Sequence, residues 1–492
     1  MRTRLALVLL ASLALKLGLL VPTSDLRPVR DSLIYVDHAC KLLRSHAYGD
    51  SGRAPGYPLA LAATFRATER AGVPVACPPE TPAGASRVSA LLVARLMQVV
   101  LSTLTVWLAW CLGRALYDER TGLAGAILVA FYPNLVGFTH LLWSETLYVA
   151  LTFGWATLLL RGVRGGRPAS LFAGGLALGA AALVREIGLL TLPVALAWTW
   201  ALEPRPARRV LARSLVIVAA AVLVVAPWTL RNVRAYGELV PISTRGGWAL
   251  LYGTSPNVMA EAKRLRLSAL DADDLKLNRM ARARAHGIIA SDPRGWLRRV
   301  VTVNVPSLWY PGYDGVIAHL VNPDGYTGVP RWLARAGIVT IVGSYLAVGV
   351  LAVVGLAFAP RPGARWLLLG MIALYAAVHA IVWGLPRHRL PLMALACLPA
   401  GWALTRRPSE WAALVTWRRL AAAGLGTVGF LVLVASNDMT LLRRRWERAA
   451  RLPRPAPPAA APTAAPTTAP TTAPTTAPQR NSRAAGLSLS SR

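Results

Sequence analysis

The sequence predicts an all-α polytopic membrane protein. Of its 492 residues, 55% are hydrophobic and only 15% are charged, which is more apolar than a soluble core of this size requires. Apolar runs of about 20 residues, the length that crosses the hydrocarbon layer as a helix, recur along the chain. Arginines gather in every second link between these runs. We therefore expect about 11 to 13 membrane-crossing helices and a small extracytoplasmic domain.

Eleven of the runs can be named as spans, because charges inside the hydrocarbon layer are costly and these runs carry few. Their approximate limits are 5–22, 88–112, 122–138, 145–160, 170–184, 187–202, 214–230, 336–359, 366–384, 390–405 and 420–436. Arg2 and Arg4 precede the first run, which lacks a small-residue cleavage site followed by a soluble domain. We expect this run to stay in place as an uncleaved anchor.

The basic links set the expected orientation, because short cytoplasmic links are rich in Lys and Arg. The basic set consists of Arg114 and Arg120; Arg161, Arg164 and Arg167; Arg205, Arg208, Arg209 and Arg213; Arg361 and Arg365; and Arg406, Arg407, Arg418 and Arg419. The other links then face outward, namely 23–87, 139–144, 185–186, 231–335 and 385–389. We expect a multi-pass protein of the plasma (inner) membrane with its chemistry on the extracytoplasmic side.

The net charge of +32 would point to nucleic acid in a soluble protein. Here most basic residues stand beside spans, where orientation and anionic lipid headgroups account for them. We expect membrane lipids as partners and no nucleic acid.

Composition divides the chain into four parts. Residues 1–230 form a transmembrane module with a long first outer loop at 23–87. Residues 231–335 are more polar and rich in Tyr and Trp, which indicates an extracytoplasmic domain or a cap on the membrane surface. Residues 336–436 add four spans. Residues 437–492 begin with a basic segment and continue as a Pro/Ala/Thr-rich tail, which is typical of an extended, disordered chain.

Two features leave alternatives open. The RRRWER run at 443–448 either lies along the outer interface as a basic amphipathic turn, or one span is miscounted. Cys40 and Cys77 share the first outer loop, where the compartment permits a disulfide without requiring one. Cys111 and Cys397 fall within spans and are expected to be core residues.

The first outer loop carries the strongest candidate for chemistry. Asp31 follows the first span, and Tyr35 and Ala39 continue one helical face at a spacing of four. The stretch from Arg53 to Pro58 then fixes a turn with two prolines and a glycine, which can hold Arg53 and Tyr57 at the membrane surface. A helix N-cap role for Asp31 is the structural alternative.

Charged residues at three further outward links extend this pattern. Glu145 begins a span, where the helix dipole also favours an acid. Arg185 interrupts apolar sequence, and ionisable residues so placed face a polar cavity or pair with each other; its neighbour Glu186 is one such partner. The PWTLRN element places Arg231 one helical turn beyond Trp228. The LPRHRLP element places Arg387 and Arg389 on an outward link, which should be poor in basic residues. The alternative for these two arginines is that they are anchors whose side chains snorkel to the membrane surface.

These motifs resemble, in their order along the chain, the GT-C glycosyltransferases that use polyprenyl-phosphate sugars, a superfamily that includes protein O-mannosyltransferases and aminoarabinose transferases. The match consists of a D-x-x-x-Y-x-x-x-A element at Asp31, an R-x-P-x-Y-P element at Arg53, an acid at Glu145, an arginine at Arg185, a P-W-x-x-R-N element at Arg231, and an R-x-R-x-P element at Arg387 and Arg389. Many relatives have two consecutive acids at the first element, whereas Ser32 follows Asp31 here.

The resemblance implies a GT-C transmembrane fold and transfer of a sugar, with inversion, from a polyprenyl-phosphate donor to an extracytoplasmic glycan, lipid or protein. Asp31 would be the general base, with Glu145 orienting donor, acceptor or an optional divalent cation. Tyr35, Arg53, Tyr57, Arg185, Arg231, Arg387 and Arg389 would bind substrate. No metal ligands are assigned, and the nearest approach to a D-x-D pair is DADD at 271–274. A flippase or transporter of lipid-linked sugars is the alternative function.

Overall fold

The computed structural model describes residues 1–23, 31–45, 48, 51–77, 88–202, 206–255, 257–264, 275–311, 315–321, 330–360, 362–382 and 384–450. The predicted tail after residue 452 and the DADD run lie outside these ranges. Residues Met1–Pro453 form one compact unit, and the boundaries that composition suggests at 230 and 335 stay predictions.

The first part of this unit supplies the elements that carry the candidate site. They are α1 (Arg2–Gly18), α2 (Leu20–Thr23), α3 (Asp31–Ser45), α4 (Gly56–Arg70), β1 (Val75–Ala76), β2 (Val88–Ser89), α5 (Ala90–Leu116), α6 (Glu119–Phe131), α7 (Pro133–Phe138), α8 (Glu145–Gly165), α9 (Pro168–Val184), α10 (Ile187–Leu202) and α11 (Ala207–Tyr236).

The middle part consists of shorter helices, and the last part returns to long apolar ones. The middle elements are α12 (Gly246–Thr254), α13 (Val258–Arg264), α14 (Leu275–Ser291), α15 (Pro293–Arg299), a π-helical turn at Val300–Asn304, α16 (Val305–Trp309) and α17 (Gly315–Leu320). The last are α18 (Arg331–Phe358), α19 (Pro362–Ile381), a 3₁₀ turn at Pro386–Arg389, α20 (Leu390–Leu404), α21 (Pro408–Leu414), α22 (Trp417–Ala435) and α23 (Thr440–Ala450).

The helical prediction is confirmed for all eleven apolar runs. Six helices of the described chain are long and apolar enough to cross a membrane, and they are α1 with α2, α5, α8, α11, α18 and α22. Shorter apolar helices are α9, α10 and the Arg365–Ile381 part of α19. The run at 122–138 divides into α6 and α7 because Tyr132 is extended and Pro133 starts a new helix. The protein is a multi-pass integral membrane protein.

Glycines allow close packing of the central helices. A Cβ added to Gly122 of α6 would lie 2.8 Å from the backbone nitrogen of Arg114 on α5, and one added to Gly401 of α20 would lie 2.7 Å from that of Gly125. Small residues at helix contacts let backbones approach closely in membranes, where hydrophobic burial between helices contributes little. The α5, α6 and α20 helices therefore form a tight centre for the bundle.

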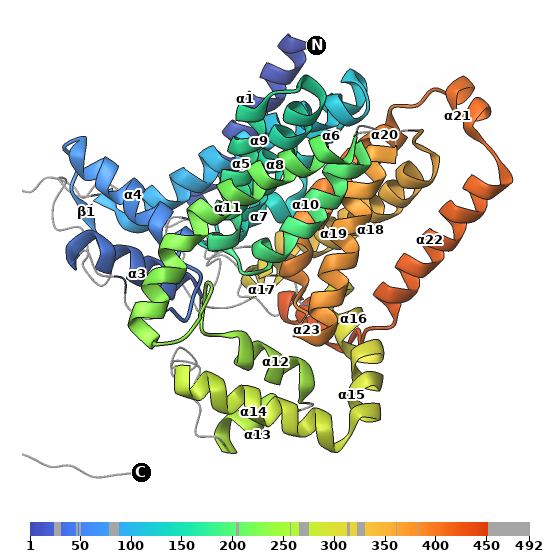
Figure 1. Cartoon of the computed structure of the whole chain (residues 1–492). Coiled ribbons are helices and arrows are strands. Elements are labelled where there is room, and N and C mark those ends of the chain that lie inside the picture. Colours follow the sequence, from blue (N-terminus) through green and yellow to red (C-terminus); the bar gives the residue numbers. More distant parts are fainter. Residues whose placement is uncertain are drawn as a thin grey trace, which may run out of the picture. The chain divides into compact units, whose positions relative to one another are not determined.

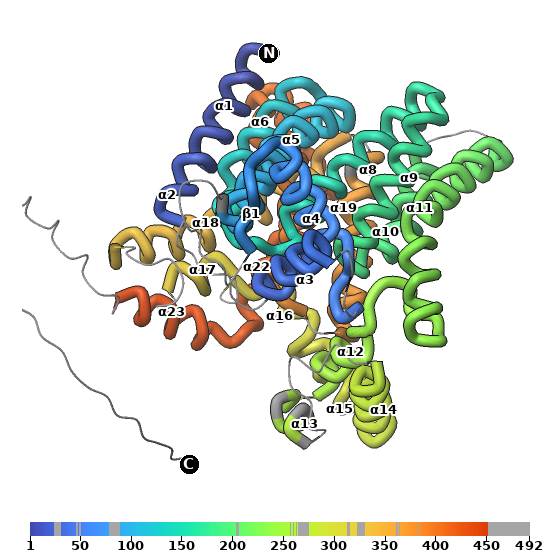
Figure 2. Tube along the Cα trace, turned by 90° about the vertical axis from the view of Figure 1, so that its left-hand side faces the viewer, coloured from blue at the N-terminus to red at the C-terminus, as the bar shows by residue number. Residues whose placement is uncertain are grey.

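The two ends of the bundle differ in content. The N-terminus and α21 lie toward one end of the unit, whereas α12, α16 and α23 lie toward the other (Figure 1). The view turned by 90° shows the same separation, with α12, α15 and α23 away from the N-terminus (Figure 2). At this second end α12 and α14 surround a small apolar cluster of Trp248, Leu251, Ala281 and Ala285, separate from the main core.

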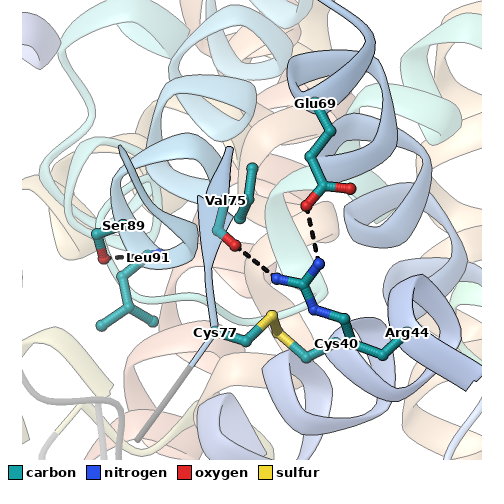
Figure 3. The surroundings of a disulfide bond; sticks show 7 residues. All are labelled: Cys40, Arg44, Glu69, Val75, Cys77, Ser89 and Leu91. Carbon is teal, nitrogen blue, oxygen red and sulfur yellow. Dashed lines mark hydrogen bonds and ion pairs between the residues drawn. A yellow bond between two sulfur atoms is a disulfide. The ribbon is translucent and has the colours of Figure 1, made fainter. Parts of the chain in front are cut away.

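A disulfide joins Cys40 of α3 to Cys77, just beyond β1 (Figure 3). Next to it, Arg44 donates hydrogen bonds to the Glu69 carboxylate of α4 and to the Val75 carbonyl. Strands β1 and β2 pair in parallel. These contacts tie α3, the helix that begins with Asp31, to α4 and to the start of α5.

This arrangement predicts the thiol count of the denatured protein. Without reductant, a maleimide reagent should modify only Cys111 and Cys397, the two free cysteines. After reduction it should modify all 4 cysteines.

The Cys40→Ala, Cys77→Ala variant should lose about 2 to 4 kcal/mol of stability, because the closed loop no longer restricts the unfolded chain. The Cys111→Ala, Cys397→Ala variant is the control for this loss of stability. In the labelling experiment, four reactive thiols without reductant would contradict the Cys40–Cys77 bridge.

Candidate active site

Asp31 forms the centre of the candidate site. It is the first residue of α3, and its two carboxylate oxygens bind two different arginines. Arg53 Nη2 lies 2.8 Å from Oδ1, and Arg387 Nη1 lies 2.7 Å from Oδ2. The carboxylate thus joins three segments that are far apart in sequence.

The turn that carries Arg53 is pressed against the end of α9. A Cβ on Gly56 would lie 2.7 Å from the backbone carbon of Leu183, so glycine is required for this approach. Ala54 is buried in a small apolar cluster with Ala182 and Val225. The Arg53 guanidinium is therefore placed by packing of the backbone around it.

Glu145 extends the charge cluster into the bundle. Its Oε1 lies 2.6 Å from Nη1 of Arg185 and 3.8 Å from Nε of Arg387. The Glu145 residue is 1% exposed and begins α8. Arg185 follows α9 in an extended conformation, which turns its side chain toward α8. We call the five residues Asp31, Arg53, Glu145, Arg185 and Arg387 the charge cluster.

The pKa of Asp31 reflects two opposing effects. Burial alone would raise the pKa of its carboxyl group, but the guanidinium groups of Arg387 and Arg53 outweigh burial and hold the pKa well below its usual range. Asp31 is therefore ionised throughout the physiological pH range in this structure. Its basicity would rise if either arginine were drawn away.

Several polar atoms at the cluster lack hydrogen bonds to the described part of the chain. They are Oε2 of Glu145, Nε of Arg387 and Nε1 of Trp143, all buried. The Arg387 guanidinium also lies over the Trp143 ring, 4.9 Å from its centroid. Buried polar groups are nearly always satisfied in native proteins, so these three atoms are candidates for hydrogen bonds to a polar ligand.

The two predicted tyrosines lie beside Asp31. Tyr35 and Tyr57 meet edge to face with ring centroids 5.1 Å apart, and the Tyr57 hydroxyl accepts a hydrogen bond of 2.9 Å from Nε2 of Gln98. Tyr57 and Gln98 are fully buried. Sequence reasoning missed Gln98 and Trp143. A polar amide inside the second span was a signal for Gln98, whereas nothing separates Trp143 from the other membrane tryptophans.

Two predicted arginines lie outside the charge cluster. Arg231 donates to Oγ of Ser51 at 2.7 Å and to the Tyr48 carbonyl at 3.0 Å, which braces the turn before Arg53. Arg389 is 3% exposed and donates to the carbonyls of Leu308 and Tyr310, both at 2.9 Å. Their contact with phosphate stays a prediction. The pairing of Arg185 with Glu186, left open as an alternative, is replaced by Arg185 with Glu145, and Glu186 accepts from Ser243.

An apolar groove of about 410 Å³ runs between α9, α10 and α11. Ala182 and Val225 line it and belong to the same small apolar cluster as Ala54, the residue after Arg53. Leu189 and Val222 line it further along. The groove therefore begins beside the turn that carries Arg53 and continues among helices that cross or enter the membrane.

The described side chains around Asp31 and Glu145 do not suit a resident metal ion. Within the described ranges, no three His, Cys, Asp or Glu side chains converge on one point. Asp31 and Glu145 each already bind a guanidinium group. A divalent cation at either carboxylate would face strong repulsion from the neighbouring arginines.

Comparison with known proteins agrees with this architecture. Residues 87–230 match the family of dolichyl-phosphate-mannose-protein mannosyltransferases. The chain is also similar in structure to the archaeal oligosaccharyltransferase AglB from Archaeoglobus fulgidus, solved with an inhibitory peptide and a dolichol-phosphate. That alignment has a TM-score of 0.50 and 14% identity, and it covers 93% of this chain and 56% of the archaeal chain. The chain has the GT-C fold.

Two other GT-C structures are similar to this chain. ArnT from Cupriavidus metallidurans, solved with undecaprenyl phosphate, aligns with a TM-score of 0.42 and 13% identity over 90% of this chain and 73% of its own. The arabinofuranosyltransferase AftD from Mycobacteria aligns with a TM-score of 0.38 and 16% identity over 89% and 28%. This chain spans about half the length of the archaeal oligosaccharyltransferase AglB. No curated protein matches its sequence significantly.

The lowered pKa of Asp31 predicts how its ion pairs depend on pH. A carboxyl group with a depressed folded-state pKa stabilises the protein above its unfolded pKa of about 3.9, and the contribution is lost as the pH falls toward the folded value. Asp31→Asn should lower the unfolding free energy by about 1 to 3 kcal/mol. This difference should stay constant from about pH 8 to pH 5 and shrink on further acidification.

The measurement is thermal unfolding of the two proteins over this pH range. Asp37→Asn is the matched control, because Asp37 lies on the same helix in an exposed pair with Lys41 and should change stability by only a few tenths of a kcal/mol. A difference that disappeared between pH 8 and pH 6 would show that the two arginines do not hold Asp31 ionised.

Proposed function

We propose that this protein is a membrane glycosyltransferase that moves a sugar from a polyprenyl-phosphate donor to an extracytoplasmic acceptor. One observation carries the proposal. Two carboxylates and three arginines meet inside a membrane helix bundle, and Ala54, next to one of these arginines, shares a small apolar cluster with two residues that line an apolar groove. That combination suits a ligand with a long apolar chain, a phosphate and a reactive sugar.

The arginines of the cluster suit a bound phosphate. Arg387 lies at ion-pair distance from both Asp31 and Glu145, and its buried Nε has no hydrogen bond to a described residue. A buried polar group is costly unless a hydrogen-bond partner compensates it. A phosphate beside Arg387 and Arg53 would supply such a partner, and arginine matches phosphate geometry well.

The same arginines connect donor binding to catalysis. A phosphate that shares Arg387 and Arg53 would weaken their hold on Asp31 and add a negative charge near it, and both effects raise the pKa of Asp31. The freed carboxylate would then accept the proton of the acceptor hydroxyl as its oxygen bonds to the anomeric carbon. The bond from that carbon to the phosphate oxygen breaks, and the arginines stabilise the departing polyprenyl phosphate.

Glu145 and the tyrosines would orient the sugar. Oε2 of Glu145 and Nε1 of Trp143 are buried without a hydrogen bond from the described residues, so they can receive and donate hydrogen bonds to sugar hydroxyls. A divalent cation has no step in this reaction. The basic links favour an extracytoplasmic position for the cluster, with the protein in the plasma (inner) membrane.

The relatives support the proposal by what they bind. The archaeal oligosaccharyltransferase with the same fold was solved with a dolichol-phosphate, a lipid of the class proposed here as the carrier. In this chain the polyprenyl tail would occupy the groove between α9, α10 and α11.

Transfer should depend on Asp31. Membranes that contain the wild type should move radiolabelled sugar from at least one donor in a panel of polyprenyl-phosphate sugars. Asp31→Asn should reduce the rate about 100-fold or more, because it removes the general base. Asp118→Asn is the matched control, since Asp118 also pairs with an arginine, Arg406, at 2.7 Å but lies outside the charge cluster.

Two results would contradict this function. Equal transfer by the wild type and Asp31→Asn would exclude Asp31 as the base. Absence of transfer from every donor, with the protein folded and able to bind polyprenyl phosphate, would favour a flippase of lipid-linked sugars.

The groove should set the preference for long donors. Val222 is 53% exposed and lines the groove, so Val222→Trp should fill part of it. We expect KM for a long-chain donor to rise about 10-fold, which corresponds to about 1.4 kcal/mol, with little change for a short-chain analogue. Leu215→Trp on the same helix is the control, because Leu215 is 61% exposed and is not among the groove residues. An equal effect of both substitutions would argue against tail binding here.

A further inference from the structure

The basic helix α23 has no role in the proposed transfer, yet it is firmly placed. The backbone N–H of Leu442 donates to the Tyr310 hydroxyl at 3.0 Å. Asn437, just before the helix, donates to the Pro306 carbonyl at 3.0 Å. Ala449 is fully buried. These contacts fix α23 against the bundle, so its exposed face has a defined direction.

That exposed face is strongly basic. The helix has four arginines and one glutamate in the sequence TLLRRRWERAA. The side chain of Arg443 is 80% exposed, and its 3.0 Å pair with Glu447 is an exposed pair within the helix. Arg335 of α18 lies over the Trp446 ring, 5.0 Å from its centroid, and Arg331 stands one turn before it. We call Arg331, Arg335, Arg443, Arg444, Arg445 and Arg448 the α23 surface.

The α23 surface stands where spans end. Both α18, which begins at Arg331, and α22, which ends five residues before α23, are long and apolar enough to cross a membrane. Trp332, in the first turn of α18, is 70% exposed. Tryptophans and long basic side chains gather at the boundary between hydrocarbon and water, which favours a position of α23 along the membrane surface.

The α23 surface is also at the same end of the bundle as the charge cluster. Arg389, two residues after Arg387, donates to the Tyr310 carbonyl at 2.9 Å. The Tyr310 hydroxyl accepts from Leu442 of α23. One tyrosine thus links the turn that carries Arg387 to α23.

We infer that the α23 surface binds the headgroups of anionic phospholipids in the leaflet beside the active site. Under the orientation of the proposed function, this end is extracytoplasmic, where an excess of arginine is opposite to the usual distribution. An orientation signal therefore does not explain it. Anionic phosphates at headgroup depth match the charge, the amphipathic helix and the tryptophans. Of the two alternatives for the RRRWER run, the inference favours an interfacial helix at the outer surface over a miscounted span.

The test uses the full-length protein in vesicles of equal parts phosphatidylglycerol and phosphatidylcholine. Benzoylphenylalanine replaces Glu447 in α23, and lipid adducts formed on illumination are identified by mass spectrometry. We expect about threefold more phosphatidylglycerol than phosphatidylcholine adduct at low salt, and a smaller ratio in 1 M salt. Replacing Arg443, Arg444, Arg445 and Arg448 by glutamine should bring the ratio close to one.

A matched position supplies the control. The same photoreactive residue in place of Glu410 of α21, at the other end of the bundle (Figure 1), should give a ratio that the α23 substitutions do not change. Circular dichroism and the Cys40–Cys77 bridge report whether the variant is folded. Equal adduct yields in the wild type, an unchanged ratio in the α23 variant, or no lipid adduct at residue 447 would overturn the inference. None of these readouts depends on sugar transfer.

Discussion

The candidate site depends on the mutual neutralisation of charges inside an apolar bundle. Asp31, Arg387, Glu145 and Arg185 follow one another at salt-bridge distance, with Arg53 at the other side of Asp31. No one of these charges could be buried alone without a large penalty. The network therefore fixes how α3, α8, the α9–α10 link and the turn after α19 meet.

The ion pairs of this network stabilise the site, and its arginines can exchange a carboxylate partner for a bound phosphate. Its carboxylates satisfy much of the positive charge, but buried atoms of Arg387, Glu145 and Trp143 have no hydrogen bond to a described residue. In the proposed function a bound phosphate would supply partners to the arginines. Binding of such a ligand and activation of Asp31 would then be two results of one redistribution of ion pairs.

Much of the fold and part of the site could be predicted from the sequence. Apolar runs and basic links predicted the helices, because the membrane imposes strict length and charge requirements. Motif order identified the members of the charge cluster. It could not pair them, since Asp31 and Arg387 are 356 positions apart and only the folded chain brings them together. It also did not separate Arg387 from Arg389, whose side chains leave the same short turn toward different partners.

Exchange of arginines between Asp31 and a phosphate is the central claim, and equilibrium binding of polyprenyl phosphate tests it most directly. If Asp31 competes with the phosphate for Arg53 and Arg387, folded Asp31→Asn should bind the lipid phosphate about 10-fold more tightly than the wild type, or about 1.4 kcal/mol. Arg387→Gln should bind it more weakly. Weaker or unchanged binding by Asp31→Asn would contradict the account, because the carboxylate would then not occupy the phosphate's partners.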